Sequence, residues 1–227
     1  TRVSGDVLTV RLVNLRRSPG RSSPAVPSIV AMDLLRVGLS AARETLMVES
    51  IPIAIGWKRL MEDLLAPDVA GLVWRGRGPG NGRELKRAYS GILGRFFARA
   101  YLESFEQITE LQPIDGKLMT YANRFQVRRR TSSGDMPDWI GLSANGDPII
   151  AEGKGSYSGG NWKKAQWPKP IRNALEQIDR VEIRDLAANA NTSTGKKIDF
   201  QGVGGRIPLG RSRRSKKSHH HCGGPSG

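Results

Sequence analysis

One short stretch of the chain, MPDWIGLSANGDPIIAEGKGS at residues 136–156, brings acidic and basic side chains to the end of an apolar run. The apolar run covers 148–151 and is typical of a buried strand. Glu152 and Lys154 follow it, two residues apart. Because residues i and i+2 of a strand point to the same face, we expect these two side chains to lie side by side.

A second acidic residue lies one predicted strand upstream. The dipeptide Asn145-Gly146 is a strong turn signal between two apolar runs. The segments 138–143 and 148–154 are therefore predicted to pair as a hairpin. Asp138 begins the first of these strands, next to the carboxylate and the ammonium group of the second.

Two carboxylates at one place repel each other unless a cation lies between them. Oxygen ligands of this kind suit Mg²⁺ or Mn²⁺, and we expect Asp138, Glu152 and the backbone carbonyl of Gly153 to bind such an ion. A bound ion lowers the pKa of a coordinated water and neutralises charge that develops on a phosphate. Lys154 then holds that water or the phosphate in line. The pattern predicts a site that hydrolyses phosphodiester bonds.

The plain alternative is the end of a surface strand. In that case Glu152 and Lys154 form only a same-face ion pair, which contributes little to stability. The apolar run, the hairpin and the flanking helices favour the catalytic interpretation.

The charge of the whole chain points to a polyanionic partner. The 227 residues include 36 Lys and Arg against 21 Asp and Glu, a formal charge of +15. Such a surplus favours nucleic acid by Coulomb attraction and counterion release. It also leaves open a nucleic-acid-binding domain that does not cut, or an assembly protein with a basic surface.

The cellular setting is predicted from what the sequence contains. Cys222 is the lone cysteine, so neither a disulfide framework nor a zinc cluster is expected. We see no apolar run of about 18 residues and no signal-peptide pattern, so we expect no membrane partner and a cytoplasmic location.

The pattern of apolar residues predicts an α/β fold. The Gly-rich basic segment 74–87 is predicted to be a flexible loop, and Gly91 and Gly94 are expected to let a long helix pack closely on a sheet. The predicted strands are 7–15, 117–130, 138–143, 148–154 and 196–205, the predicted helices are 29–50, 56–66, 83–111 and 171–190, and 16–28 is predicted to be a loop or linker.

Three parts of the chain follow from this pattern. Residues 1–82 are predicted to form an N-terminal strand, a linker and a mostly helical extension. Residues 83–205 form the core. Residues 206–227 are predicted to be a disordered basic tail because they are low in complexity.

The residues Pro137-Asp138, followed by Glu152-Gly153-Lys154 after an apolar strand, resemble the PD-(D/E)XK nuclease superfamily, the restriction-endonuclease-like fold. The predicted order of helix, three strands, helix and strand is similar to that family's core, a mixed sheet flanked by helices. The resemblance covers about residues 83–205. It implies a Mg²⁺-dependent nuclease, most plausibly acting on DNA, and a possible homodimer.

The resemblance also implies a role for each residue of the site. Asp138 and Glu152 bind the metal, and Lys154 assists the nucleophilic water. Many members add an acidic residue from the first core helix, for which Glu103 is the candidate and Glu106 the reserve; each is alternatively a solvated helix residue. Some members carry a glutamine on the next helix, and Gln177 occupies that place.

Basic residues beside the motif are the predicted contacts to nucleic acid. Arg128, Arg129 and Arg130 precede the site, and Lys163 and Lys164 follow it between two tryptophans. A solvated turn is the alternative for the arginines.

Overall fold

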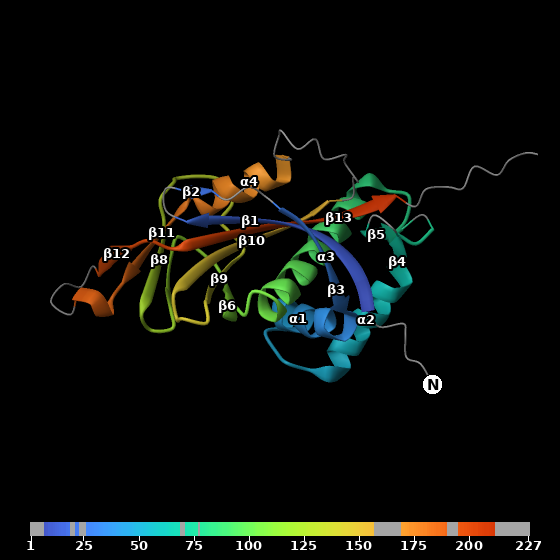
Figure 1. Ribbon diagram of the computed structural model, residues 1–227, viewed down its shortest axis with the longest axis horizontal. Helices are drawn as coiled ribbons and strands as arrows, with labels where there is room; N and C mark the ends of the chain where they lie inside the picture. Colours follow the sequence, from blue (N-terminus) through green and yellow to red (C-terminus); the bar gives the residue numbers. More distant parts are fainter. Residues whose placement is uncertain are drawn as a thin grey trace, which may run out of the picture.

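A computed structural model gives the fold of the chain. It describes residues 7–18, 21–22, 26–68, 71–76, 78–156, 169–189 and 195–211. Within these ranges the protein is a mixed α/β structure in which helices lie on both sides of long central strands (Figure 1).

The larger sheet contains nine of the described strands, in the order β2-β1-β13-β10-β9-β6, with β3 paired to β1 and β5 paired to β13 and β4. Strands β6, β9 and β10 form an antiparallel meander, whereas β13 runs parallel to β10. Their bounds are β1 Val7–Ser18, β2 Arg21–Ser22, β3 Val26–Asp33, β4 Leu65–Asp68, β5 Gly71–Trp74, β6 Thr109–Pro113, β9 Trp139–Leu142, β10 Pro148–Ser156 and β13 Gln201–Arg211.

The helices have identifiable local causes. The Asp33 carboxylate caps the first helix by accepting the N–H of Leu35 at 2.7 Å. A proline stands in the first turn of the second helix, where its missing N–H is not needed. The bounds are α1 Leu34–Leu46, α2 Ile51–Leu64, α3 Arg83–Ser104 and α4 Lys169–Ile178, with the short 3₁₀ helix η1 at Ala187–Asn189.

Alternate residues of β9 and β10 divide the interior into two cores. Trp139, Ile149 and Ala151 pack with α1, α2 and α3. Their neighbours Ile140 and Ile150 pack with α4 and the smaller sheet. The strands that carry the predicted site are therefore buried on both faces.

The smaller sheet is antiparallel, in the order β12-β11-β8-β7. One of its faces covers the second core. Its strands are β7 Leu118–Tyr121, β8 Phe125–Arg129, β11 Val181–Asp185 and β12 Lys196–Ile198.

Helix α3 lies directly against β10. A Cβ atom on Gly155 would lie 1.5 Å from the carbonyl oxygen of Ser90, and one on Gly94 would lie 2.3 Å from the Cα of Gly155. Close packing through Gly94 is thus confirmed, whereas a Cβ on Gly91 would meet nothing within 4 Å.

The predicted hairpin is confirmed. Ala151 pairs with Trp139 and Pro148 pairs with Leu142. The order of helix, three strands, helix and strand is present as α3-β6-β9-β10-α4-β13, but its first strand is β6, at the end of the segment predicted to be helix. The predicted strand 117–130 forms instead the hairpin of β7 and β8 in the smaller sheet.

Residues 1–82 were predicted to form an extension separate from the core, and the pairing of β1 with β13 contradicts this separation. Within the segment predicted to be a loop or linker, residues 16–18 extend β1, 21–22 form β2 and 26–28 begin β3, and β1 pairs with β13 of the core sheet. The start of the predicted helix 29–50 belongs to β3, because its β-branched residues pair with β1 and tertiary pairing outweighs helical spacing. The described strands and helices of the first 82 residues thus belong to the main sheet and to the helices that pack on it.

Two C-terminal boundaries also differ from the prediction. Helix α4 ends at Ile178, and the β-branched residues Val181 and Ile183 form β11. The predicted disordered tail begins too early, because β13 continues to Arg211; residues 212–227 lie outside the described part. No helix in the described ranges is both long and apolar enough to cross a membrane.

Candidate active site

The two carboxylates predicted to meet do so at the start of β9. The pairing of Ala151 with Trp139 places Asp138 opposite Glu152. The backbone N–H of Asp138 donates to Glu152 Oε2 at 2.8 Å, and the N–H of Gly153 donates to Asp138 Oδ2 at 2.8 Å. Each carboxylate is therefore fixed by the backbone of the other strand.

Lys154 lies beside Glu152, as the strand period predicts. Its ammonium group forms an ion pair with Glu152 Oε1. Glu152 is only 2 % exposed, and its Oε1 is buried without a hydrogen bond from any described group. The Lys154 side chain is 28 % exposed and so reaches from the solvent toward a buried carboxylate.

Gly153 separates these two residues because helix α3 leaves no room for a side chain. A Cβ there would lie 2.7 Å from the Cβ of Ala98 and 3.1 Å from the ring of Trp139. The glycine in the Glu-Gly-Lys motif is thus required by packing.

A second basic residue, Arg95 of α3, belongs to the site and was missed from the sequence. Its guanidinium group donates to Asp138 Oδ1 and also, at 2.8 Å, to Glu44 Oε1 on α1. The same group lies over the ring of Trp139, 4.9 Å from its centroid. The indole N–H of Trp139 donates to Glu44 Oε2 at 2.7 Å. Arg95 therefore links Asp138 to a fixed partner on α1.

The accessory candidate Glu103 lies further along the same network. Arg99 donates to Glu44 at 3.0 Å and to Glu103 at 2.9 Å. Glu103 also accepts from Ser40 and Arg43, each at 2.8 Å. It is thus connected to Asp138 through two arginines and Glu44, and it is a half-buried network residue rather than a fully solvated one.

The reserve candidate and the missed residues are explained by helix geometry. Glu106 follows α3 and accepts from the hydroxyl of Tyr101 at 2.8 Å. Arg95, Arg99 and Glu103 are spaced by four residues, a spacing that places them on one helix face. That stripe is visible in the sequence and could have identified Arg95.

Burial sets the proton affinity of the two carboxyl groups. Desolvation, together with the neighbouring Asp138, raises the pKa of Glu152 to about 8. Desolvation also raises the pKa of Asp138, although Arg95, the Gly153 N–H and Lys154 oppose this shift. Burial lowers the pKa of Arg95, but the Asp138 and Glu44 carboxylates outweigh it, so that pKa is raised. A cation nearer to Glu152 would favour its ionised form.

Gln177 holds the segment that leads into the site. This buried residue of α4 donates through Nε2 to the carbonyl oxygen of Met136 at 3.1 Å. Pro137 and Asp138 follow directly. Gln177 therefore positions the backbone of the site and donates to a carbonyl, not to a carboxylate.

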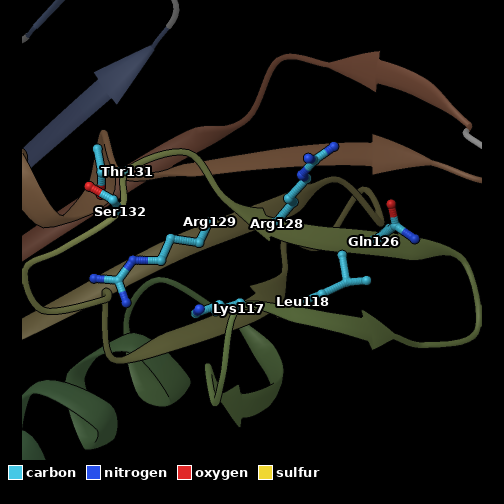
Figure 2. Close-up of a pocket in the computed structure, with 7 residues that line it drawn as sticks. All are labelled: Lys117, Leu118, Gln126, Arg128, Arg129, Thr131 and Ser132. Carbon is cyan, nitrogen blue, oxygen red and sulfur yellow. The ribbon is translucent and has the colours of Figure 1, made fainter.

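The predicted nucleic-acid contacts lie on the smaller sheet. Arg128 and Arg129 line a cleft beside the β7–β8 hairpin (Figure 2). Arg130 follows them and donates its backbone N–H to the carbonyl of Arg180 at 2.7 Å. Lys163 and Lys164 lie outside the described residues.

The donor set at Asp138 and Glu152 is small. Among the described residues, no group of three or more His, Cys, Asp or Glu side chains is arranged around one point as a metal site. Mg²⁺ is often held by one or two carboxylates together with waters and substrate phosphates. Glu152 Oε1, which pairs with the Lys154 ammonium group, is the oxygen that would bind such an ion.

Comparison of the chain with protein-family models, with curated proteins and with solved structures found no match.

Proposed function

We propose that this chain is a metal-dependent nuclease of the PD-(D/E)XK type that hydrolyses phosphodiester bonds in DNA. One observation carries the proposal. The carboxylates of Asp138 and Glu152 lie side by side in a largely buried place, and the Lys154 ammonium group is paired with Glu152 Oε1. Two adjacent buried carboxylates repel each other, and groups perturbed in this way cluster at functional sites, so this arrangement favours a functional role.

The order of elements supports the same proposal. Helix α3, the antiparallel strands β6, β9 and β10, helix α4 and the parallel strand β13 follow the order that the resemblance implies. The β7–β8 hairpin and the strands β11 and β12 are inserted between these elements and form the smaller sheet.

The chain's own residues would divide the work among them. Asp138 Oδ1, Glu152 Oε1 and the carbonyl of Gly153 would hold Mg²⁺, which supplies an activated water and neutralises phosphate charge. Lys154 would orient the attacking water or the scissile phosphate. Arg95 must release Asp138 Oδ1 to free it as a ligand, and it keeps Glu44 as its partner when it does so.

A nucleic-acid-binding domain without catalysis is the second candidate, and a specific observation favours it. Arg95 and Lys154 already provide one cation for each of the two carboxylates. In that case the cluster is a structural ion-pair network, and the +15 charge of the chain alone accounts for binding.

Cleavage of circular DNA by a Lys154→Ala variant separates the two candidates. The control is Lys196→Ala, which removes the same charge from an exposed position on β12. Nicking that requires Mg²⁺ or Mn²⁺, survives in Lys196→Ala and is lost in folded Lys154→Ala supports the nuclease. Nicking that is unchanged in Lys154→Ala contradicts the assigned role, and DNA binding without any nicking supports the second candidate.

A further inference from the structure

A cleft of about 430 Å³ opens beside the smaller sheet (Figure 2). Neither Asp138 nor Glu152 lines it. Its walls come from the start of β7, from β8 and from the loop after β8. The lining contains three cationic side chains, two hydroxyl groups, one amide and one apolar side chain: Lys117, Arg128, Arg129, Thr131, Ser132, Gln126 and Leu118.

The three cations of the cleft lack acidic partners. Neither Lys117 nor Arg128 nor Arg129 forms an ion pair with any residue in the described part of the chain. The residue opposite Arg128 on β11 is Glu182, but its carboxylate pairs with Arg184 at 2.8 Å and Lys197 at 3.4 Å. Because the lining carries positive charge that no acidic side chain balances, the cleft favours an anion.

The hydrogen-bond donors of the cleft are partly used within the protein, since the Thr131 hydroxyl donates to the carbonyl of Ser133 at 3.1 Å. Arg129 donates through Nη2 to the carbonyl of Gly134, whereas its Nε is buried without a partner among the described groups. Guanidinium, ammonium and hydroxyl groups are the donors that phosphate oxygens accept in nucleic-acid complexes. The lining therefore fits a phosphate group better than an apolar ligand.

A short, well-held loop joins the cleft to the candidate active site. Arg180 donates to the carbonyl of Asp135 at 2.8 Å, and Gln177 donates to that of Met136 at 3.1 Å. Ser132 and Asp138 are six residues apart, so they lie within about 20 Å of each other. At about 3.4 Å per base pair, that span corresponds to roughly six base pairs of duplex.

From these observations we infer that the cleft binds a backbone phosphate of the nucleic-acid substrate, within roughly six base pairs of the bond to be cut. The distance from the cleft to the bond that is cut rests on the proposed function. Phosphate binding in the cleft does not require catalysis. The cleft thus supplies a fixed second contact that sets how the strand enters the site.

The test is the affinity of a Lys117→Gln/Arg128→Gln double variant for a 20-base-pair duplex, measured by fluorescence anisotropy with chelator present. Both side chains are exposed, so the fold should be kept. The matched control is Arg36→Gln/Arg59→Gln, which removes two exposed arginines from α1 and α2. A salt titration accompanies each measurement, because each phosphate contact contributes about 0.9 to the slope of log K against log salt.

We expect the cleft variant to bind about tenfold more weakly and to lose between roughly one and two units of salt slope. The control should stay within about twofold of wild type. Equal losses in both variants, or no loss in the cleft variant, would overturn the inference.

A competition experiment identifies the source of the phosphate. Inorganic phosphate and a mononucleotide are titrated against the bound duplex, and we expect either to compete only at concentrations at least 100-fold higher. Competition as strong as that of unlabelled duplex would mean that the cleft is a small-anion site, which contradicts the inference. Chelator prevents metal-dependent cleavage throughout these measurements. The binding result can therefore be interpreted even if the protein does not cut DNA.

Discussion

Two charged regions of this protein differ in how their charges are balanced. Where the start of β9 meets the middle of β10, each carboxylate has its own cation: Asp138 is paired with Arg95, and Glu152 with Lys154. At the β7–β8 cleft, the lining contains three cations and no acidic partner for them in the described chain. The first region is largely buried, whereas the second is open to solvent.

The difference indicates what each region needs from outside. A buried carboxylate must be paired, or it becomes protonated; the raised pKa of Glu152 shows that Lys154 alone does not fully compensate burial. An exposed cationic cleft is tolerated because water screens it, and it gains most when an anion arrives. We therefore expect the first region to respond to metal and pH, and the second to salt and phosphate.

The largest effect should come from Asp138→Asn, which removes the charge and keeps the shape. DNA nicking should fall by at least about 1,000-fold, equivalent to roughly 4 kcal/mol, because a metal ligand is lost. DNA affinity in chelator should stay within about twofold of wild type, since the cleft is intact. Nicking within tenfold of wild type would contradict the role of Asp138 as a ligand.

The next effect is on pH dependence. Because the pKa of Glu152 is raised from its unfolded value to about 8, its contribution to stability is fully present at acidic pH and is lost as pH rises through about 8. Metal-free protein should lose on the order of 4 kcal/mol of unfolding free energy across this window. Stabilisation by Mg²⁺ should grow over the same window, since the carboxylate must ionise to bind.

Denaturant unfolding at several pH values measures this dependence, and Glu152→Gln is the control. That variant should show a flatter profile and little stabilisation by Mg²⁺. A wild-type profile that rises between neutral pH and pH 9 would have the opposite sign and would rule out a strongly raised pKa.

A smaller effect is expected from Arg95→Gln. The change leaves Glu44 and Asp138 without their shared cation, so metal-free protein should lose roughly 1–3 kcal/mol of unfolding free energy. Mg²⁺ should raise its melting temperature more than that of wild type, because Asp138 Oδ1 is then free. Arg43→Gln, which breaks pairs with Glu103 and Glu49, is the control and should not change the Mg²⁺ response. An equal Mg²⁺ response in Arg95→Gln and wild type would show that Arg95 does not compete with the ion.

The smallest effect on activity should come from Glu103→Gln. Its carboxylate contacts Ser40, Arg43 and Arg99 and reaches Asp138 only through further residues. Nicking should stay within about twofold of wild type, while thermal unfolding shows a loss of about 1–2 kcal/mol from the broken network. A loss of nicking as large as that of Asp138→Asn would make Glu103 a ligand after all.

The central hairpin could be predicted because its causes are local. Asn145-Gly146 fixes the turn, and the period of two places Glu152 beside Lys154. The close packing of Gly94 on β10 was predicted, but the same prediction for Gly91 was wrong, because the spacing alone does not show which glycine faces the strand.

The remaining structure depends on contacts that are distant in sequence. Strand β6 and the start of β3 have helix-like or mixed spacing, and they become strands through pairing with β9 and β1. Glu44 reaches the site because α1 packs on α3, a juxtaposition that spacing within α1 does not predict. The linker prediction failed because turn-forming residues there connect two long paired strands instead of two domains.

Nicking of supercoiled circular DNA by folded wild-type protein, with Mg²⁺ and with chelator, tests the central claim most directly. If the protein is a metal-dependent nuclease, open-circle product appears with Mg²⁺, disappears with chelator and is absent in Lys154→Ala. Folded protein that binds the same DNA in a salt-dependent way, yet makes no open circle with Mg²⁺ or Mn²⁺, would contradict the nuclease and leave a nucleic-acid-binding domain.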